Sequence, residues 1–125
     1  MPDKYLRIMS VHINFNLDHP YFREPLRVRV EWKFPFLPRV GELVNAWIWI
    51  EEAEISNEKI ESLLTAEGED SRNAEIHKTF SLNAWLYEVG MECNKVYSIS
   101  YYKEDSAPHD IYVEMYLNDT GIYHR

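Results

Sequence analysis

The sequence predicts an α+β domain built on a mostly antiparallel, strongly bent sheet, or small partly open barrel, of about five strands with one or two short helices. Segments of period-two alternation, typical of half-buried strands, recur along the chain. Hydrophobic residues make up 46% and aromatic residues 14% of the chain, as in a folded protein. The 125 residues fit a single domain over 1–125, with a core that needs no metal or disulfide.

Two segments near the N-terminus alternate most clearly. In residues 5–17 the even positions turn polar from Ser10 onward, which predicts a strand with one buried face. Residues 26–34 alternate without error between apolar and charged side chains, and a loop with two prolines, residues 18–25, precedes them. Residues 43–50 are apolar on both faces, so we expect a strand that is covered on both sides.

The middle of the chain carries signals of a helix start. Ser56 is the expected N-cap, and Ile55 and Ile60 stand at the two positions of a hydrophobic staple. This helix is expected to end near Gly68. Residues 67–78 are then predicted to be a mobile acidic and polar loop.

The last third of the chain predicts a helix and a hairpin. Residues 80–89 match both helical and strand spacing, and a helix capped by Ser81 and ended by Gly90 is favoured. Strands over 95–103 and 110–118 are expected to be joined by a loop at 104–109. The predicted core face carries Ile111, Val113, Met115 and Leu117, paired with Tyr97, Ile99 and Tyr101. A register slip of one residue would reverse these faces.

Charge and cysteine content narrow the classes of function. The net charge is −8, and residues 51–75 hold nine acidic and two basic residues, which gives −7 for that segment alone. Acidic proteins repel phosphate backbones, so no nucleic-acid partner is expected, whereas a basic protein partner or self-association is allowed. Cys93 is the only cysteine, and the longest apolar run, 46–50, is too short to span a membrane. We therefore expect a cytoplasmic protein with no membrane partner.

The sequence carries no local signature of catalysis. Its five histidines lack the spacing that places two imidazoles on one metal, and its four glycines are too far apart to form a phosphate loop. Serine motifs of hydrolases are absent, and Cys93 has no basic neighbour that would lower its pKa. We therefore expect a protein that is not an enzyme, with no catalytic residue, metal or cofactor.

Two groups of residues are the candidate binding sites. The first is an aromatic set on the face of the sheet not assigned to the core, formed by Trp47, Trp49, Tyr102, Tyr112 and Tyr116. The second is an acidic set within residues 51–75, formed by Glu58, Glu61, Glu67 and Asp70. The alternative interpretations are an aromatic face covered by a helix and an acidic segment that is only solvated.

A corner between two predicted strands carries a family resemblance. Residues 30–42, which end in Pro38-Arg39-Val40-Gly41-Glu42, resemble small uncharacterised bacterial proteins with a strand, a P-R-[VI]-G-[DE] corner and a small β-barrel. The later segment 96–102 shares in this resemblance. It implies a compact, partly open barrel or a strongly bent sheet, and it brings no established activity. Gly41 supplies the left-handed position at which the chain can turn.

These observations favour a non-catalytic interaction module. In its sharper form, the protein is an inhibitor or immunity-type protein that presents its acidic segment to a basic enzyme. The alternative is a small-molecule-binding protein or unrecognised enzyme with an aromatic-lined pocket inside the sheet, where His12 would be the polar group.

Overall fold

The computed structural model describes residues 10–48, 55–74 and 77–119. Four strands in this part of the chain form one sheet: β1 (Val11–Asp18), β2 (Leu26–Trp32), β3 (Cys93–Glu104) and β4 (Ala107–Asp119). Between β2 and β3 come three helices: α2 (Asn57–Ser62), α3 (Ala66–Asn73) and α4 (Leu82–Glu92). The α+β class is confirmed, whereas about five strands and one or two helices were predicted.

The sheet is mixed and open. Its strand order is β2-β1-β4-β3, in which β1 and β2 are antiparallel, β3 and β4 are antiparallel, and the central pair of β1 and β4 is parallel. The prediction of a mostly antiparallel sheet is therefore corrected to a mixed one, and the barrel alternative is wrong because β2 and β3 remain edges. Hydrophobic alternation is the same in parallel and antiparallel neighbours, so it could not reveal this pairing.

The strand predicted over residues 43–50 is not formed in its described part. Leu43 makes an isolated bridge to Lys95, and residues 46–48 form a short 3₁₀ turn. This turn buries Ala46 and Trp47 in the core, while Ile48 is 55% exposed. The run therefore touches the edge of β3 only at Leu43 and Val44, and it then packs Ala46 and Trp47 into the core instead of continuing as a strand.

Helix α2 begins as predicted and ends early. The Ser56 hydroxyl accepts the Lys59 N–H at 3.1 Å, and Ile60 is buried. The helix ends at Ser62, and Thr65 caps a second helix, α3, through residues 66–73. The prediction of a loop over 67–78 is wrong for this stretch, because a threonine cap restarts the helix just before Gly68.

Helix α4 confirms the helical interpretation of residues 80–89. Ser81 caps it by accepting the Ala84 N–H at 3.1 Å, and Trp85, Leu86 and Val89 are buried at helical spacing. The helix does not end at Gly90 as predicted but continues to Glu92.

The C-terminal hairpin is longer than predicted, since only residues 105 and 106 lie between its strands. The predicted loop at 104–109 is therefore mostly strand. The core face of β4 is confirmed from Val113 to Leu117, with Ile111 partly buried. Ile99 is partly buried opposite Met115, which fits its predicted place on the core face, but Tyr101 is 61% exposed instead of lying in the core. A register shift before Ser98 places Tyr97 against Tyr116 instead of on the core face. Strand bulges of this kind leave no simple mark in the alternation.

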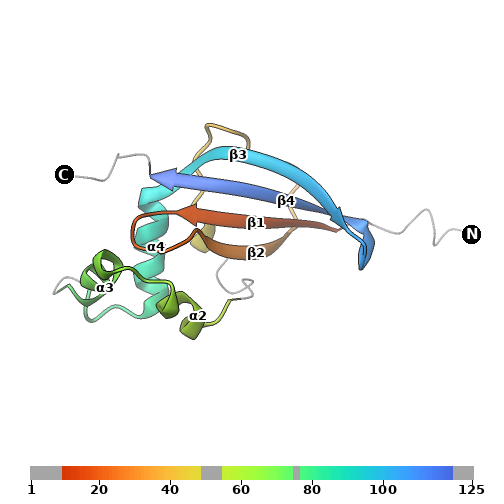
Figure 1. Ribbon diagram of the computed structural model, residues 1–125. Helices are drawn as coiled ribbons and strands as arrows, with labels where there is room; N and C mark the ends of the chain where they lie inside the picture. The colour runs from red at the N-terminus through yellow and green to blue at the C-terminus, as the bar shows by residue number, and fades with distance from the viewer. Residues whose placement is uncertain (1–9, 49–54, 75–76, 120–125) are drawn as a thin grey trace, which may run out of the picture.

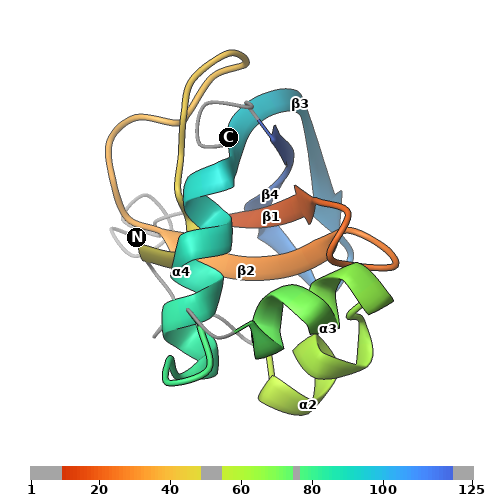
Figure 2. The same ribbon diagram turned by 90° about the vertical axis from the view of Figure 1, so that its left-hand side faces the viewer.

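The helices gather at one end of the sheet, where α2 and α3 lie side by side and α4 packs across the strands (Figures 1 and 2). The hairpin turn between β3 and β4 lies at the other end (Figure 1). One hydrophobic core joins the inner faces of the strands to Trp47, Ile60 and Trp85. No helix within the described ranges has the length and apolar character to cross a membrane.

Candidate functional site

The outer face of the sheet, opposite the core, carries a cluster of polar and aromatic side chains from all four strands. We call it the polar sheet face, formed by His12, Asn14, Asn16, Arg27, Arg29, Tyr102, Glu104, Asp110, Tyr112, Glu114 and Tyr116. The register aligns Asn14 of β1 with Arg29 of β2 and with Glu114 of β4. Side chains that alternate along the chain thereby become neighbours across the sheet.

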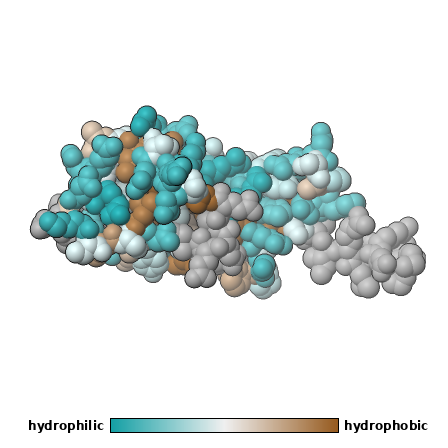
Figure 3. Space-filling view, turned by 90° about the horizontal axis from the view of Figure 1, so that it is seen from below, coloured by the Kyte–Doolittle hydropathy of each residue, from teal (hydrophilic) through white to brown (hydrophobic). Residues whose placement is uncertain are grey.

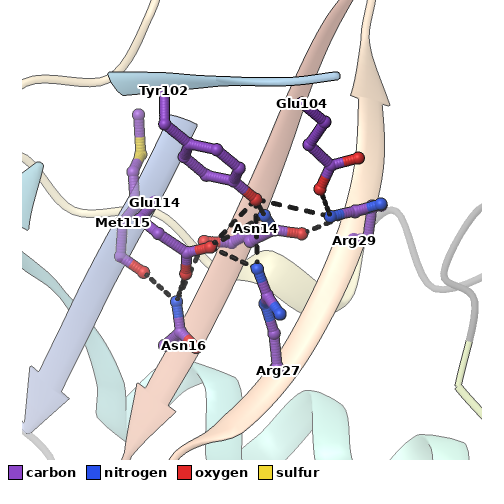
Figure 4. A network of polar contacts seen from close by, with 8 residues as sticks. All are labelled: Asn14, Asn16, Arg27, Arg29, Tyr102, Glu104, Glu114 and Met115. Atoms are coloured by element: carbon purple, nitrogen blue, oxygen red, sulfur yellow. Dashed lines mark hydrogen bonds and ion pairs between the residues drawn. The ribbon is translucent and has the colours of Figure 1, made fainter. Parts of the chain in front are cut away.

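Asn14, Tyr102 and Glu114 form the centre of this face (Figure 4). The Asn14 amide group donates to the Tyr102 hydroxyl and to a Glu114 carboxylate oxygen, both at 2.9 Å. Asn16 donates to the second carboxylate oxygen of Glu114 at 2.6 Å. Asn14 is fully buried and Asn16 is 5% exposed, so these bonds satisfy amides that water does not reach.

Arg27 and Arg29 of β2, the strand next to β1, also contact this centre (Figure 4). Arg27 forms an ion pair with Glu114, and its Nη2 lies 3.2 Å from the Tyr102 hydroxyl. Arg29 donates from Nε to the Asn14 side-chain oxygen at 2.8 Å and pairs with Glu104 at 3.4 Å. Two cations and two carboxylates therefore balance within the cluster.

A histidine–aspartate pair extends the cluster toward the hairpin turn. His12 Nε2 lies 3.0 Å from an Asp110 carboxylate oxygen, and the His12 ring stacks on Tyr112 at 4.7 Å. The hydrogen bond with His12 lowers the pKa of Asp110 below its usual value. Burial, and then the nearby Glu104 charge, raises the pKa of Tyr112, while the Arg29 guanidinium lies 5.0 Å from the ring centre.

This arrangement is suited to rigid binding more than to proton transfer. Both oxygens of Glu114 accept hydrogen bonds, and Asn14 uses both its amide group and its side-chain oxygen within the cluster. A polar network with matched donors and acceptors holds its side chains in one geometry. Tyrosine and arginine are also the side chains that protein interfaces favour.

The structure brings together part of the predicted aromatic set. Tyr102, Tyr112 and Tyr116 share the polar sheet face, as predicted, and the rings of Tyr102 and Tyr112 stack at 5.3 Å. Trp47 does not belong with them, because it is 1% exposed in the core on the helix side. Trp49 lies outside the described residues. The tryptophan was assigned to the outer face because residues 43–50 were expected to be a strand.

The predicted acidic set lies elsewhere, on the two short helices. Glu58 and Glu61 belong to α2, Glu67 and Asp70 belong to α3, and all four are exposed. Glu69, which the sequence reasoning did not single out, lies with them on α3 and is also exposed.

The asparagines and arginines of the polar sheet face were missed as site residues. Asparagine is depleted in strands, so Asn14 and Asn16 at alternate positions of a strongly patterned strand were an available signal. Arg27 and Arg29 alternate in the same way on β2. Their partners Tyr102 and Glu114 are about 90 residues away in sequence, so only the fold reveals them.

A second histidine, His19, directly follows the last residue of β1, and Cys93 is the first residue of β3. Both lie at the same end of the sheet, since Cys93 contacts the Asp18 carbonyl oxygen at 3.6 Å. His19 is buried, receives the Tyr21 N–H on Nδ1 at 3.2 Å and places Nε2 3.2 Å from Glu92. Burial, and then the Asp18 charge, raises the pKa of the Cys93 thiol to about 12, which opposes a nucleophilic role. In the ranges that the structure describes, no three histidine, cysteine or carboxylate side chains gather to hold a metal.

Two open cavities lined by described residues border the sheet. One, of about 390 Å³, lies near the end of β2 beside Trp32 and Phe34. The other, of about 320 Å³, lies between α2 and the beginning of β2. The aromatic-lined one lies at the sheet margin, and His12 is not part of its lining.

Comparisons with known proteins bring no identification. No family model matches the chain, and no similar curated protein or solved structure is found.

Proposed function

We propose that this protein is a non-catalytic interaction module that binds a basic protein partner through an acidic helical surface. We define this acidic helical surface as Glu58, Glu61, Glu67, Glu69 and Asp70. An inhibitor or immunity-type protein directed against a basic enzyme is the sharper form of the proposal.

The state of these carboxylates is the observation that carries the proposal. All five are exposed, and within the described ranges none of them forms an ion pair. Three carboxylates of the polar sheet face differ, since Glu104, Asp110 and Glu114 are each paired with a basic side chain. The two short helices therefore gather five carboxylates without an ion pair within residues 58–70.

This surface has the physical properties of an electrostatic docking site. Figure 3 shows the molecule from below, where hydrophilic residues prevail over the end that carries the helices. Helices α2 and α3, which carry these carboxylates, are packed against the rest of the protein. Ile60 of α2 is buried, and Gly68 of α3 packs against the Tyr21 backbone. Complementary charge steers a partner and speeds its association.

A capture experiment tests the proposal. The protein, immobilised, is exposed to its native lysate at about 50 mM and about 500 mM salt, and bound proteins are identified by mass spectrometry. We expect a basic protein that is retained at low salt and lost at high salt. Salt-insensitive capture would contradict the electrostatic proposal.

Charge-matched variants locate the surface. Neutralising Glu58, Glu61, Glu67 and Asp70 together, to glutamine or asparagine, should abolish capture. The control neutralises four other exposed carboxylates, Glu31, Glu42, Glu88 and Asp105, and keeps the same net charge. Equal loss in both variants would show an effect of net charge alone and would sink the assignment to the helices.

A further inference from the structure

The cavity between α2 and the sheet has the size of a small-ligand site. Its volume of about 320 Å³ is near the lower end of the range for ligand pockets, so its ligand is small. Ile55 and Leu63 from the α2 region and Pro25 from the loop before β2 give it an apolar lining.

Charged side chains of both signs also line this cavity. Lys59 of α2 and Glu24 of the loop before β2 line the same cavity. They form no ion pair with each other or with another described residue. Arg27 adds a second cation, whose Nη2 is engaged by Glu114 and Tyr102. The guanidinium has five N–H donors, so it retains others for a ligand.

A neutral hydroxyl completes the border. Tyr116 lines the cavity, and its ring contacts Tyr97 at 6.1 Å between centroids. Its hydroxyl has no hydrogen-bond partner in the part of the chain that the structure describes. It can therefore donate to or accept from a bound molecule.

We propose that this cavity binds a small zwitterion of the amino-acid class with an apolar side chain. Arg27 and Lys59 would hold the carboxylate, Glu24 the ammonium group, and the apolar lining the side chain. A simple anion is opposed by Glu24 and by the acidic helical surface beside it, and a simple cation is opposed by the two basic residues. A zwitterion satisfies both signs of charge at once.

A titration of the ¹⁵N-labelled protein followed by NMR tests this proposal with L-leucine as the probe. We expect saturable shifts of the backbone amides of Glu24, Arg27 and Lys59. Leucinamide, which lacks the carboxylate, and 4-methylpentanoate, which lacks the ammonium group, should each bind at least about tenfold more weakly, because each loses a charged hydrogen bond. Absence of saturable shifts with leucine, or equal binding of either analogue, overturns the proposal.

Exposed-residue variants assign the binding to this cavity. Lys59→Met and Glu24→Gln should each weaken leucine binding about tenfold, for the same reason. Lys95→Met and Glu88→Gln are the controls on exposed positions outside the cavity lining, and they should bind like the unaltered protein. Unchanged binding by both cavity variants would overturn the proposal. The assay contains no protein partner, so its result is separate from that of the capture experiment.

Discussion

At the scale of single residues, Cys93 shows how a fold removes reactivity from a side chain. The thiol is fully buried at the start of β3, and its Sγ lies 3.3 Å from the Leu117 carbonyl oxygen. Burial raises its pKa from 9.0 to about 12, with the Asp18 and Asp119 charges acting in the same direction. Sequence reasoning also predicted an ordinary thiol, from the lack of basic neighbours.

Cys93 should resist alkylation in the native protein. The rise in pKa from 9.0 to about 12 lowers the thiolate fraction at pH 8 about a thousandfold, and burial adds a steric barrier. Iodoacetamide labelling followed by mass spectrometry should be very slow in buffer and fast in concentrated urea. Native labelling at the rate seen in urea would contradict the buried placement.

The His12–Asp110 pair gives a prediction on pH dependence. Replacing His12 by Asn should raise the pKa of Asp110 toward 3.8, since the bond with His12 is the largest cause of its lowering. Because the folded pKa lies below that of the unfolded chain, the contact adds stability above pH 3.8 that is lost as pH falls through the lowered pKa.

The carboxyl ¹³C shift of Asp110 measures this pKa directly. Urea unfolding between about pH 5 and pH 2 should show that the His12→Asn variant loses less stability on acidification than the unaltered protein. An unchanged titration midpoint of Asp110 in the variant would show that His12 does not control it.

At the scale of elements, the starts of α2 and α4 were predicted from the sequence, whereas their ends and the start of α3 were not. Ser56 and Ser81 cap helices through bonds to N–H groups three residues later, which is a local relation that sequence carries. Gly68 and Gly90 were interpreted as helix ends, yet both lie inside helices. Each leaves room for a distant segment, the backbone of Tyr21 in one case and residues 45–47 in the other.

Alanine at either glycine should therefore destabilise the protein. A Cβ at Gly68 would lie 2.3 Å from the Tyr21 carbonyl oxygen, and one at Gly90 would lie 2.2 Å from the Asn45 side-chain oxygen. We expect losses of about 1–3 kcal/mol in the free energy of unfolding, measured with urea. Gly68→Ala should cost more, because backbone yields less readily than a side chain.

The control for these variants is Asn83→Ala, at an exposed position of α4. Helix propensity alone predicts that it gains about 0.5 kcal/mol and that glycine-to-alanine changes gain about 1 kcal/mol. Stabilisation of the two glycine variants would mean that the close approaches do not exist.

At the scale of the whole molecule, the sequence predicted which face of each strand is apolar but not which strands lie next to each other. Alternation of apolar and polar residue types identified the inner faces of β1, β2 and β4, because successive side chains of a strand point to opposite faces of the sheet. The parallel contact between β1 and β4 joins residues about 100 positions apart, and no local pattern encodes such a pairing. The polar sheet face depends on that contact, so its network could not be predicted before the fold was known.

The network joins the two hairpins of the fold, which leads to a prediction about Glu114. This residue of β4 accepts hydrogen bonds from Asn14 and Asn16 of β1 and pairs with Arg27 of β2. Glu114→Gln replaces one accepting oxygen by a donor that faces other donors. We expect the free energy of unfolding to fall by about 1–3 kcal/mol.

Urea unfolding of Glu114→Gln is compared with Glu31→Gln, an exposed position on β2 that should change stability by less than about 0.5 kcal/mol. Combining Glu114→Gln with Tyr102→Phe should cost less than the sum of the two, since both remove bonds from one network. Additive losses, or a Glu114→Gln loss no larger than that of Glu31→Gln, would mean that the outer face does not hold the hairpins together. The helices and their core alone would then fix the position of β4 beside β1.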